Sequence, residues 1–239
     1  MRKVLTAVCL MGAMSASYAF ADSDKAKLDE RLNNAAAVIN EVMAVPDKAI
    51  PDAITKAAKC VMVIPSEKKA AFGVGASYGQ GVVTCRTGHG WSAPAFVRLG
   101  GASFGFQIGG SATDLVLVAV NDKGMQDLLH SKIKLGGDAS AAAGPVGRDA
   151  QAATSLNMGA ELLTYSRSKG LFAGIDLSGD VIDQNADDTT TYYGADVSYE
   201  KILHGTPAVP PGGAAHHFSA SVAHYFRSVQ YLNRFFRDG

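Results

Sequence analysis

The chain has 239 residues, 26 glycines, no formal net charge and only 18% charged residues. Its 47% hydrophobic content excludes a disordered chain, which needs low hydrophobicity and high charge. The balanced charge gives no electrostatic basis for binding nucleic acid, so we exclude that class of partner. The length is sufficient for one compact domain with a sizeable core.

Residues 1–21 have the pattern of a secretory signal peptide. Arg2 and Lys3 precede an apolar stretch over 4–14, and residues 19–21 form a small-x-small cleavage site. No second apolar run reaches the length needed to cross a membrane, so we expect no transmembrane helix in the mature protein. We therefore expect an exported protein, periplasmic or secreted, with the surface of the outer membrane as one place of action.

Residues 25–45 show helical periodicity, since apolar residues recur at spacings of four, three, four and three. These residues are Leu28, Leu32, Ala35, Ile39 and Val42. The spacing predicts an amphipathic helix that ends at Pro46. Pro51 is placed to open a second short helix that runs to Ala58, because proline is tolerated in a first helical turn.

Cys60 and Cys85 are the two cysteines that follow the signal peptide. In an oxidising compartment they predict one disulfide, which would close a loop of 25 residues. Such a loop stabilises a fold by about 3 kcal/mol. The alternative is two separate buried thiols, since free cysteine packs like a small hydrophobe. Neither cysteine has a partner at zinc-ligand spacing, so we predict no metal site.

The middle of the chain has the pattern of strands. Residues 61–64 form a short apolar run closed by Pro65, and eleven glycines lie within the 38 residues 73–110. Apolar residues alternate there with glycine, which is typical of closely packed strands. Further strands are predicted at 115–120, 162–165 and 171–175, with a short helix at 122–129. We predict an α+β fold over residues 22–205, with a compact glycine-rich sheet or barrel-like core, an N-terminal amphipathic helix and C-terminal helices.

Residues 206–239 begin with a proline- and glycine-rich hinge and continue with aromatic and aliphatic residues at helical spacing. The apolar positions are Phe218, Val222, Phe226, Val229, Leu232 and Phe236. Arg227, Arg234 and Arg237 make this predicted helix basic. Two interpretations stay open: the helix docks on the core, or it contacts an anionic membrane or a protein partner.

The sequence contains partial matches to catalytic and calcium-binding motifs, but the residues that follow each match do not fit the motif. Ser77 and Ser103 each lie in a G-x-S-x-G pattern, but the residues after both continue as predicted strand rather than helix. Residues 183–187 begin like a calcium loop, yet Asp188 stands where the sharp turn needs glycine. A polar surface loop is the better interpretation there. We predict no catalytic residue, no cofactor and no enzymatic activity.

Several segments resemble the SYLF domain family. In the first half these are 60–65, 72–81, 91–94, 107–110 and 114–118. Residues 144–150 and 165–174 look like the signature stretches of the family, and the whole resemblance covers about residues 25–205.

The resemblance implies a lipid-binding module and no enzyme. Eukaryotic members are cortical adaptors that bind phosphoinositides, and some bind and bundle actin, whereas bacterial members are exported. Lipid contact in the family is associated with an N-terminal amphipathic helix, which corresponds to residues 25–45 here. That helix has no net basic excess in this chain. For this chain we therefore expect general phospholipid binding rather than binding of phosphoinositides or actin.

We infer two sets of candidate lipid-binding residues. For the headgroup we name Lys68 and Lys69, in a predicted turn between two strands, and then Arg167 and Lys169; solvated side chains are the alternative. For insertion we name Leu28, Leu32, Ile39 and Val42, which could instead pack the helix onto the sheet. The expected function is an exported, non-enzymatic phospholipid-binding protein acting peripherally at a membrane surface. The alternative is a structural or host-interaction protein that binds a protein partner through its C-terminal helix.

Overall fold

The structure is a computed structural model that describes residues 24–44, 50–130, 132–147, 159–168, 171–194, 197–209 and 212–227. Within these ranges, only the backbone is described for residues 70–74, 102–111 and 172. The predicted signal peptide, Lys169 and the last part of the predicted C-terminal helix lie outside the described residues. No helix in the described part of the chain is both long enough and apolar enough to span a bilayer.

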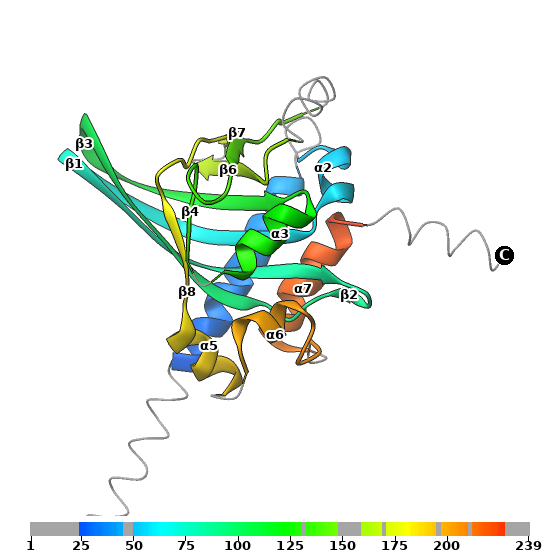
Figure 1. Cartoon of the computed structure of the whole chain (residues 1–239). Helices are drawn as coiled ribbons and strands as arrows, with labels where there is room; N and C mark the ends of the chain where they lie inside the picture. The colour runs from blue at the N-terminus through cyan, green and yellow to red at the C-terminus, as the bar shows by residue number, and fades with distance from the viewer. Residues whose placement is uncertain are drawn as a thin grey trace, which may run out of the picture.

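The fold is α+β, as predicted, with a curled sheet between helices (Figure 1). An N-terminal helix over residues 24–43 precedes α2 (Asp52–Ala57). The strands are β1 (Cys60–Thr87), β2 (Gly90–Trp91), β3 (Ala95–Ala119), β4 (Lys132–Lys134), β5 (Ala141–Ala143), β6 (Leu162–Ser168), β7 (Leu171–Gly174) and β8 (Val181–Gln184). The remaining helices are α3 (Asp122–Leu129), α5 (Ala186–Tyr193), α6 (Tyr199–Leu203) and α7 (Gly213–Tyr225).

The long strands β1 and β3 pair antiparallel along almost their whole length, from Cys60 opposite Ala119 to Val83 opposite Ala95. The expectation that Pro65 closes a short strand is wrong, because β1 continues through it. The register shifts between Ile64 and Glu67, and Ser66 has φ of 55°. This local irregularity accommodates the proline, since a bulge releases the chain from regular ladder pairing.

β1 also folds back on itself, so that its first arm lies against its second. The predicted disulfide joins Cys60 to Cys85 across these arms, with 4.0 Å between their Cα atoms. A Cβ atom on Gly81 would lie 2.3 Å from the carbonyl oxygen of Val63, so only glycine permits this approach. The fold-back gives the sheet the shape of a half-barrel, whose long curved strands are visible in Figure 1.

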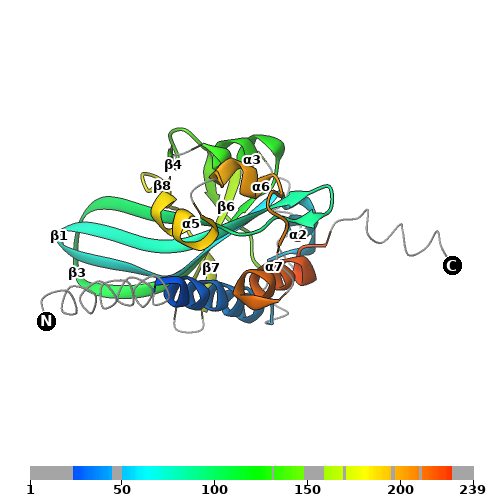
Figure 2. The same ribbon diagram turned by 90° about the horizontal axis from the view of Figure 1, so that it is seen from below.

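Both faces of the sheet are buried. Val61 and Val63 pack with the N-terminal helix and α7, whereas Met62 and Ile64 pack with residues of α3 and α6. Figure 2 shows these two pairs of helices on opposite sides of the strands. Because successive side chains of a strand point to opposite faces, a sheet covered on both sides requires a continuous apolar run.

Two local elements differ from expectation. The surface loop expected around 183–187 is instead the end of β8 and the start of α5, whose N-cap Asn185 accepts a hydrogen bond from the backbone N–H of Asp188 at 3.2 Å. α7 docks on the core through Phe218 and Val222, together with its C-cap residue Phe226, and all three are fully buried. Within the described residues, the docking interpretation of this helix is therefore the one observed.

A cationic cleft between the N-terminal helix and β1

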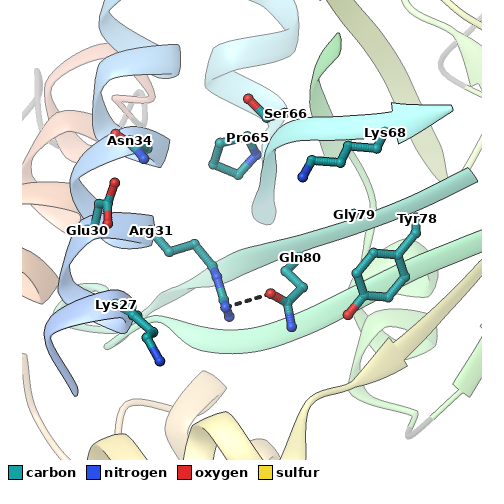
Figure 3. A pocket seen from close by; sticks show the side chains of 10 residues that line it. All are labelled: Lys27, Glu30, Arg31, Asn34, Pro65, Ser66, Lys68, Tyr78, Gly79 and Gln80. Carbon is teal, nitrogen blue, oxygen red and sulfur yellow. Dashed lines mark hydrogen bonds between the residues drawn. The ribbon is translucent and has the colours of Figure 1, made fainter. Parts of the chain in front are cut away.

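A cleft of about 480 Å³ lies between the N-terminal helix and the two arms of β1. Lys27, Glu30 and Arg31 line it from the helix. Ser66, Lys68, Tyr78 and Gln80 line it from the two arms of β1. Figure 3 shows Lys27, Arg31, Gln80, Tyr78 and Lys68 arranged around this space.

Local periodicity places these side chains in the cleft. Lys27 and Arg31 are four residues apart and therefore share one side of the helix, next to the buried stripe that contains Leu28. On β1, Lys68, Tyr78 and Gln80 occupy even positions, as expected where alternate residues of a strand face the same way. Pro65 and Ser66 join the lining at the register shift, and Gly79 lines it as well. We name this side of β1, with Ser66, Lys68, Tyr78 and Gln80, the cleft face.

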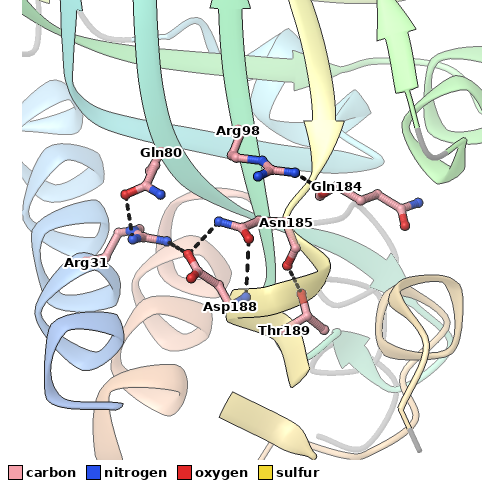
Figure 4. A network of polar contacts seen from close by, with 7 residues as sticks. All are labelled: Arg31, Gln80, Arg98, Gln184, Asn185, Asp188 and Thr189. Carbon is pink, nitrogen blue, oxygen red and sulfur yellow. Dashed lines mark hydrogen bonds and ion pairs between the residues drawn. The ribbon is translucent and has the colours of Figure 1, made fainter. Parts of the chain in front are cut away.

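Arg31 is held rigidly at the inner side of the cleft. Its guanidinium donates one hydrogen bond to Asp188 and another, of 2.8 Å, to Oε1 of Gln80. Only 15% of the Arg31 side chain is exposed, and the guanidinium carbon lies 5.8 Å from the centre of the Phe96 ring. Asp188 also accepts a 2.6 Å bond from Nδ2 of Asn185, so the network joins the helix to β1 and α5 (Figure 4).

Lys68 provides the free positive charge of the cleft. Its side chain is exposed and forms no hydrogen bond or ion pair with any residue that the structure describes. Lys27, by comparison, pairs with Asp24 at 2.9 Å, where both side chains are exposed. Tyr78 also lines the cleft, with 51% of its surface exposed.

Lys69 lies on the side of β1 away from the cleft. Its Nζ is 3.6 Å from Oε2 of Glu67, a carboxylate that is completely buried. Burial raises the pKa of Glu67, an effect that Lys69 opposes and the nearby Asp180 reinforces. We name this side of β1, with Glu67 and Lys69, the opposite face. The turn predicted at Lys68 and Lys69 is not formed, because β1 continues through both residues and alternation separates their side chains.

Arg167 is engaged in ion pairs away from the cleft lining. It contacts Oδ2 of Asp114 on β3 at 2.9 Å and also Glu41 at the end of the N-terminal helix. Oδ1 of the same aspartate accepts a 3.0 Å bond from the backbone N–H of Ser66. In this conformation Arg167 therefore joins β6 to β3 and to the helix. Lys169, its predicted companion, lies outside the described residues.

The family model described as "Ysc84: Las17-binding protein actin regulator" matches residues 100–223. The chain belongs to the Ysc84 family. This Ysc84 chain is 36% identical over 169 residues to Protein YSC84 of Saccharomyces cerevisiae, a match that covers 69% of the chain and 36% of that protein. It is 34% identical over 167 residues to SH3 domain-containing YSC84-like protein 1 of Homo sapiens, covering 69% of the chain and 48% of the relative.

LAS seventeen-binding protein 3 of Saccharomyces cerevisiae is also similar, at 36% identity over 169 residues, which cover 69% of the chain and 37% of that protein. The chain thus spans less than half the length of these curated relatives. The SYLF resemblance inferred from sequence segments is confirmed, since SYLF is another name for the Ysc84 domain.

The apolar stripe of the N-terminal helix is buried in the Ysc84 core. Leu28, Leu32, Ile39 and Val42 have at most 3% of their surface exposed and pack in one cluster with the sheet. Asp29 also accepts a 3.0 Å hydrogen bond from the hydroxyl of Tyr192 on α5. Insertion of this stripe into a membrane would therefore require the helix to leave the sheet.

Both serine motifs lie inside long strands of this Ysc84 chain. β1 runs through Ser77 and β3 through Ser103, without the strand-turn-helix geometry of a nucleophile elbow. The Ser77 hydroxyl donates to Oδ1 of Asp180 at 3.1 Å. In the described part of the chain, no group of three or more histidine, cysteine or acidic side chains is placed to hold a metal ion.

Sequence reasoning missed Lys27, Arg31, Tyr78 and Gln80 as members of one site. The spacing of Lys27 and Arg31 beside the apolar stripe, and the alternation of Tyr78 and Gln80, were the available signals. Neither signal shows that the helix and the two arms of β1 meet. That contact depends on the fold-back of β1.

Proposed function

We propose that this chain is a non-enzymatic binding protein that holds the phosphate of an anionic phospholipid headgroup in the cleft, acting peripherally at a membrane surface. The observation that carries the proposal is Lys68, an exposed cation without an ion pair to any described residue, which lines the same cleft as the fixed guanidinium of Arg31. A phosphate group accepts several charge-assisted hydrogen bonds, and this arrangement supplies the donors from two sides.

The other lining residues suit a site at the edge of a bilayer. The Tyr78 ring is amphipathic, and aromatic residues of this kind are enriched at membrane–water interfaces. Ser66 and Gln80 offer polar groups to headgroup hydroxyls. Asp24 and Asp188 compensate two of the three cations, and Glu30 adds a carboxylate to the lining. We therefore expect modest affinity that falls as salt increases.

Vesicle flotation of a Lys68→Glu variant tests this function. The substitution removes a positive charge and adds a negative one. On vesicles of phosphatidylglycerol and phosphatidylcholine this should weaken binding about 30-fold, at about 1 kcal/mol per charge near the surface. The matched control is Lys132→Glu, which makes the same charge change at an exposed position of β4. Equal binding by Lys68→Glu and wild type, or equal losses in both variants, would exclude the cleft as the headgroup site.

A protein partner is the second function we propose. It is supported by the family description, which names Las17 binding and actin regulation, and by a relative named for binding LAS seventeen. The apolar side of α7 is occupied by the core, so we assign a partner to residues 228–239 rather than to α7 itself. Removing 228–239 should abolish capture of a partner protein and leave vesicle binding unchanged; retained capture would contradict this assignment.

We also propose that the protein acts after export, on the basis of the pattern in residues 1–21. Mass spectrometry of the protein from the periplasmic or extracellular fraction should show the mass of residues 22–239. The full-length mass in the cytoplasmic fraction alone would contradict export.

A further inference from the structure

The walls of the cleft belong to two elements that are far apart in the chain. Lys27 and Arg31 come from the N-terminal helix, and Lys68, Tyr78 and Gln80 come from β1 (Figure 3). A ligand that contacts both walls loses one set of contacts when the helix moves away. We propose, as an extension of the proposed function, that a phospholipid headgroup in the cleft fastens the N-terminal helix to the sheet. Cleft occupancy and release of the helix then exclude one another.

The contacts already present show why a ligand would act on the helix. Among the described residues that line the cleft, the hydrogen bond between Arg31 and Gln80 joins the helix to β1 without a ligand. Among the described residues, Lys27, one turn earlier, contacts Asp24 of its own helix. A phosphate between Arg31 and Lys68 adds a bridge where the described residues of the two walls have no direct ion pair.

The apolar stripe makes the two states chemically different. A released helix exposes Leu28, Leu32, Ile39 and Val42, which are buried when it is docked. A ligand that binds only the docked state lowers the opening of the helix by a factor of one plus the ratio of ligand concentration to Kd. Headgroup binding in the cleft therefore opposes membrane insertion of this stripe. The two modes are alternatives for this domain rather than successive steps.

Amide hydrogen exchange of the full chain tests the proposal. The probe is a phosphatidylglycerol with two four-carbon acyl chains, which dissolves without forming a bilayer. At a probe concentration of 100 times Kd, amides of residues 24–43 that exchange through helix release should exchange about 100-fold more slowly. Amides of α3, which packs on the other side of the sheet, provide the internal reference and should slow less.

Variants separate cleft binding from general stabilisation. Lys68→Ala should reduce the slowing from about 100-fold to about 20-fold at the same probe concentration, because the loss of one charge weakens binding about fivefold. Exchange without probe should stay unchanged, since the Lys68 side chain has no ion pair with the described residues. Lys132→Ala removes an exposed lysine of β4 and should retain the full effect.

Titration calorimetry with the same probe measures headgroup binding separately from the fastening of the helix. Slower exchange confined mainly to residues 24–43 supports the fastening of the helix. Binding with unchanged or faster exchange of the helix, or with equal slowing in α3, overturns this inference and leaves the proposed function intact. No binding of the probe overturns the headgroup function, and the fastening with it.

Discussion

The two faces of β1 differ in the exposure and pairing of their charged residues, although these residues are adjacent in the sequence. On the cleft face, Lys68 and Tyr78 are exposed and available to a ligand. On the opposite face, one residue away, the Glu67 carboxylate is fully buried and pairs with Lys69. The difference shows that alternation along a strand can divide adjacent charged residues between ligand contact and internal structure. Changes on the opposite face should affect stability, and changes on the cleft face should affect binding.

The largest expected effect comes from the close contact between the arms of β1. Gly81→Ala places a Cβ atom 2.3 Å from the carbonyl oxygen of Val63 and 2.7 Å from Cγ1 of Ile64. We expect a loss of about 3 kcal/mol in the free energy of unfolding, measured with denaturant, because neither backbone nor a packed core side chain can yield easily. Gly88→Ala is the control, since a Cβ there meets nothing within 4 Å. Equal stability of the two variants would contradict the close fold-back.

Removing the disulfide tests the same contact through the unfolded chain. The double change Cys60→Ala and Cys85→Ala opens a loop of 25 residues. It should lower the free energy of unfolding by about 3 kcal/mol, slightly less than the Gly81 change. The reason is that the unfolded chain regains the freedom that the cross-link removed. Thermal unfolding with and without a reducing agent should show the same loss in wild type and no further loss in the variant. An unchanged midpoint in reduced wild type would argue against this disulfide.

Paired alanine variants compare the two lysines directly. Lys69→Ala leaves a buried carboxylate without its cation and should cost about 1 kcal/mol, a value reduced by the 39% exposure of Lys69. Lys68→Ala should change stability by less than about 0.5 kcal/mol but weaken binding to anionic vesicles about fivefold. Denaturant unfolding and vesicle flotation on both proteins measure the contrast. Similar profiles for the two variants would remove the functional division between the faces.

The smallest expected effect is a pH dependence caused by Glu67. Burial raises the pKa of this carboxyl above its ordinary value of 4.5, so the folded state binds its proton more tightly than the unfolded state. The resulting stabilisation is present below pH 4.5 and is lost as the pH rises through the folded pKa. Glu67→Gln should therefore gain stability relative to wild type as the pH rises from 4 to 7, because the amide has no charge to bury. A constant difference across this range would show that Glu67 does not titrate as a buried group.

The sequence by itself determined the elements whose signals are local. Spacings of three and four residues predicted the N-terminal helix, and the structure buries the predicted apolar stripe from Leu28 to Val42. The cysteine count and the expected compartment predicted the pairing of Cys60 with Cys85. The segments at 144–150 and 165–174 indicated the family. Such features are predictable because each depends on neighbouring residues or on a few distinctive ones.

Only the tertiary structure decided where the cleft lies and which lysine lines it. A polar segment that begins with Pro65 has the composition of a turn, but pairing of β1 with β3 on both sides of a register shift keeps it extended. That extension sends Lys68 and Lys69 to opposite faces. The fold-back of β1 then brings Lys68 near Tyr78, and packing of the helix adds Arg31 to them. These contacts join residues tens of positions apart, and no local pattern encodes such a meeting before the chain has folded.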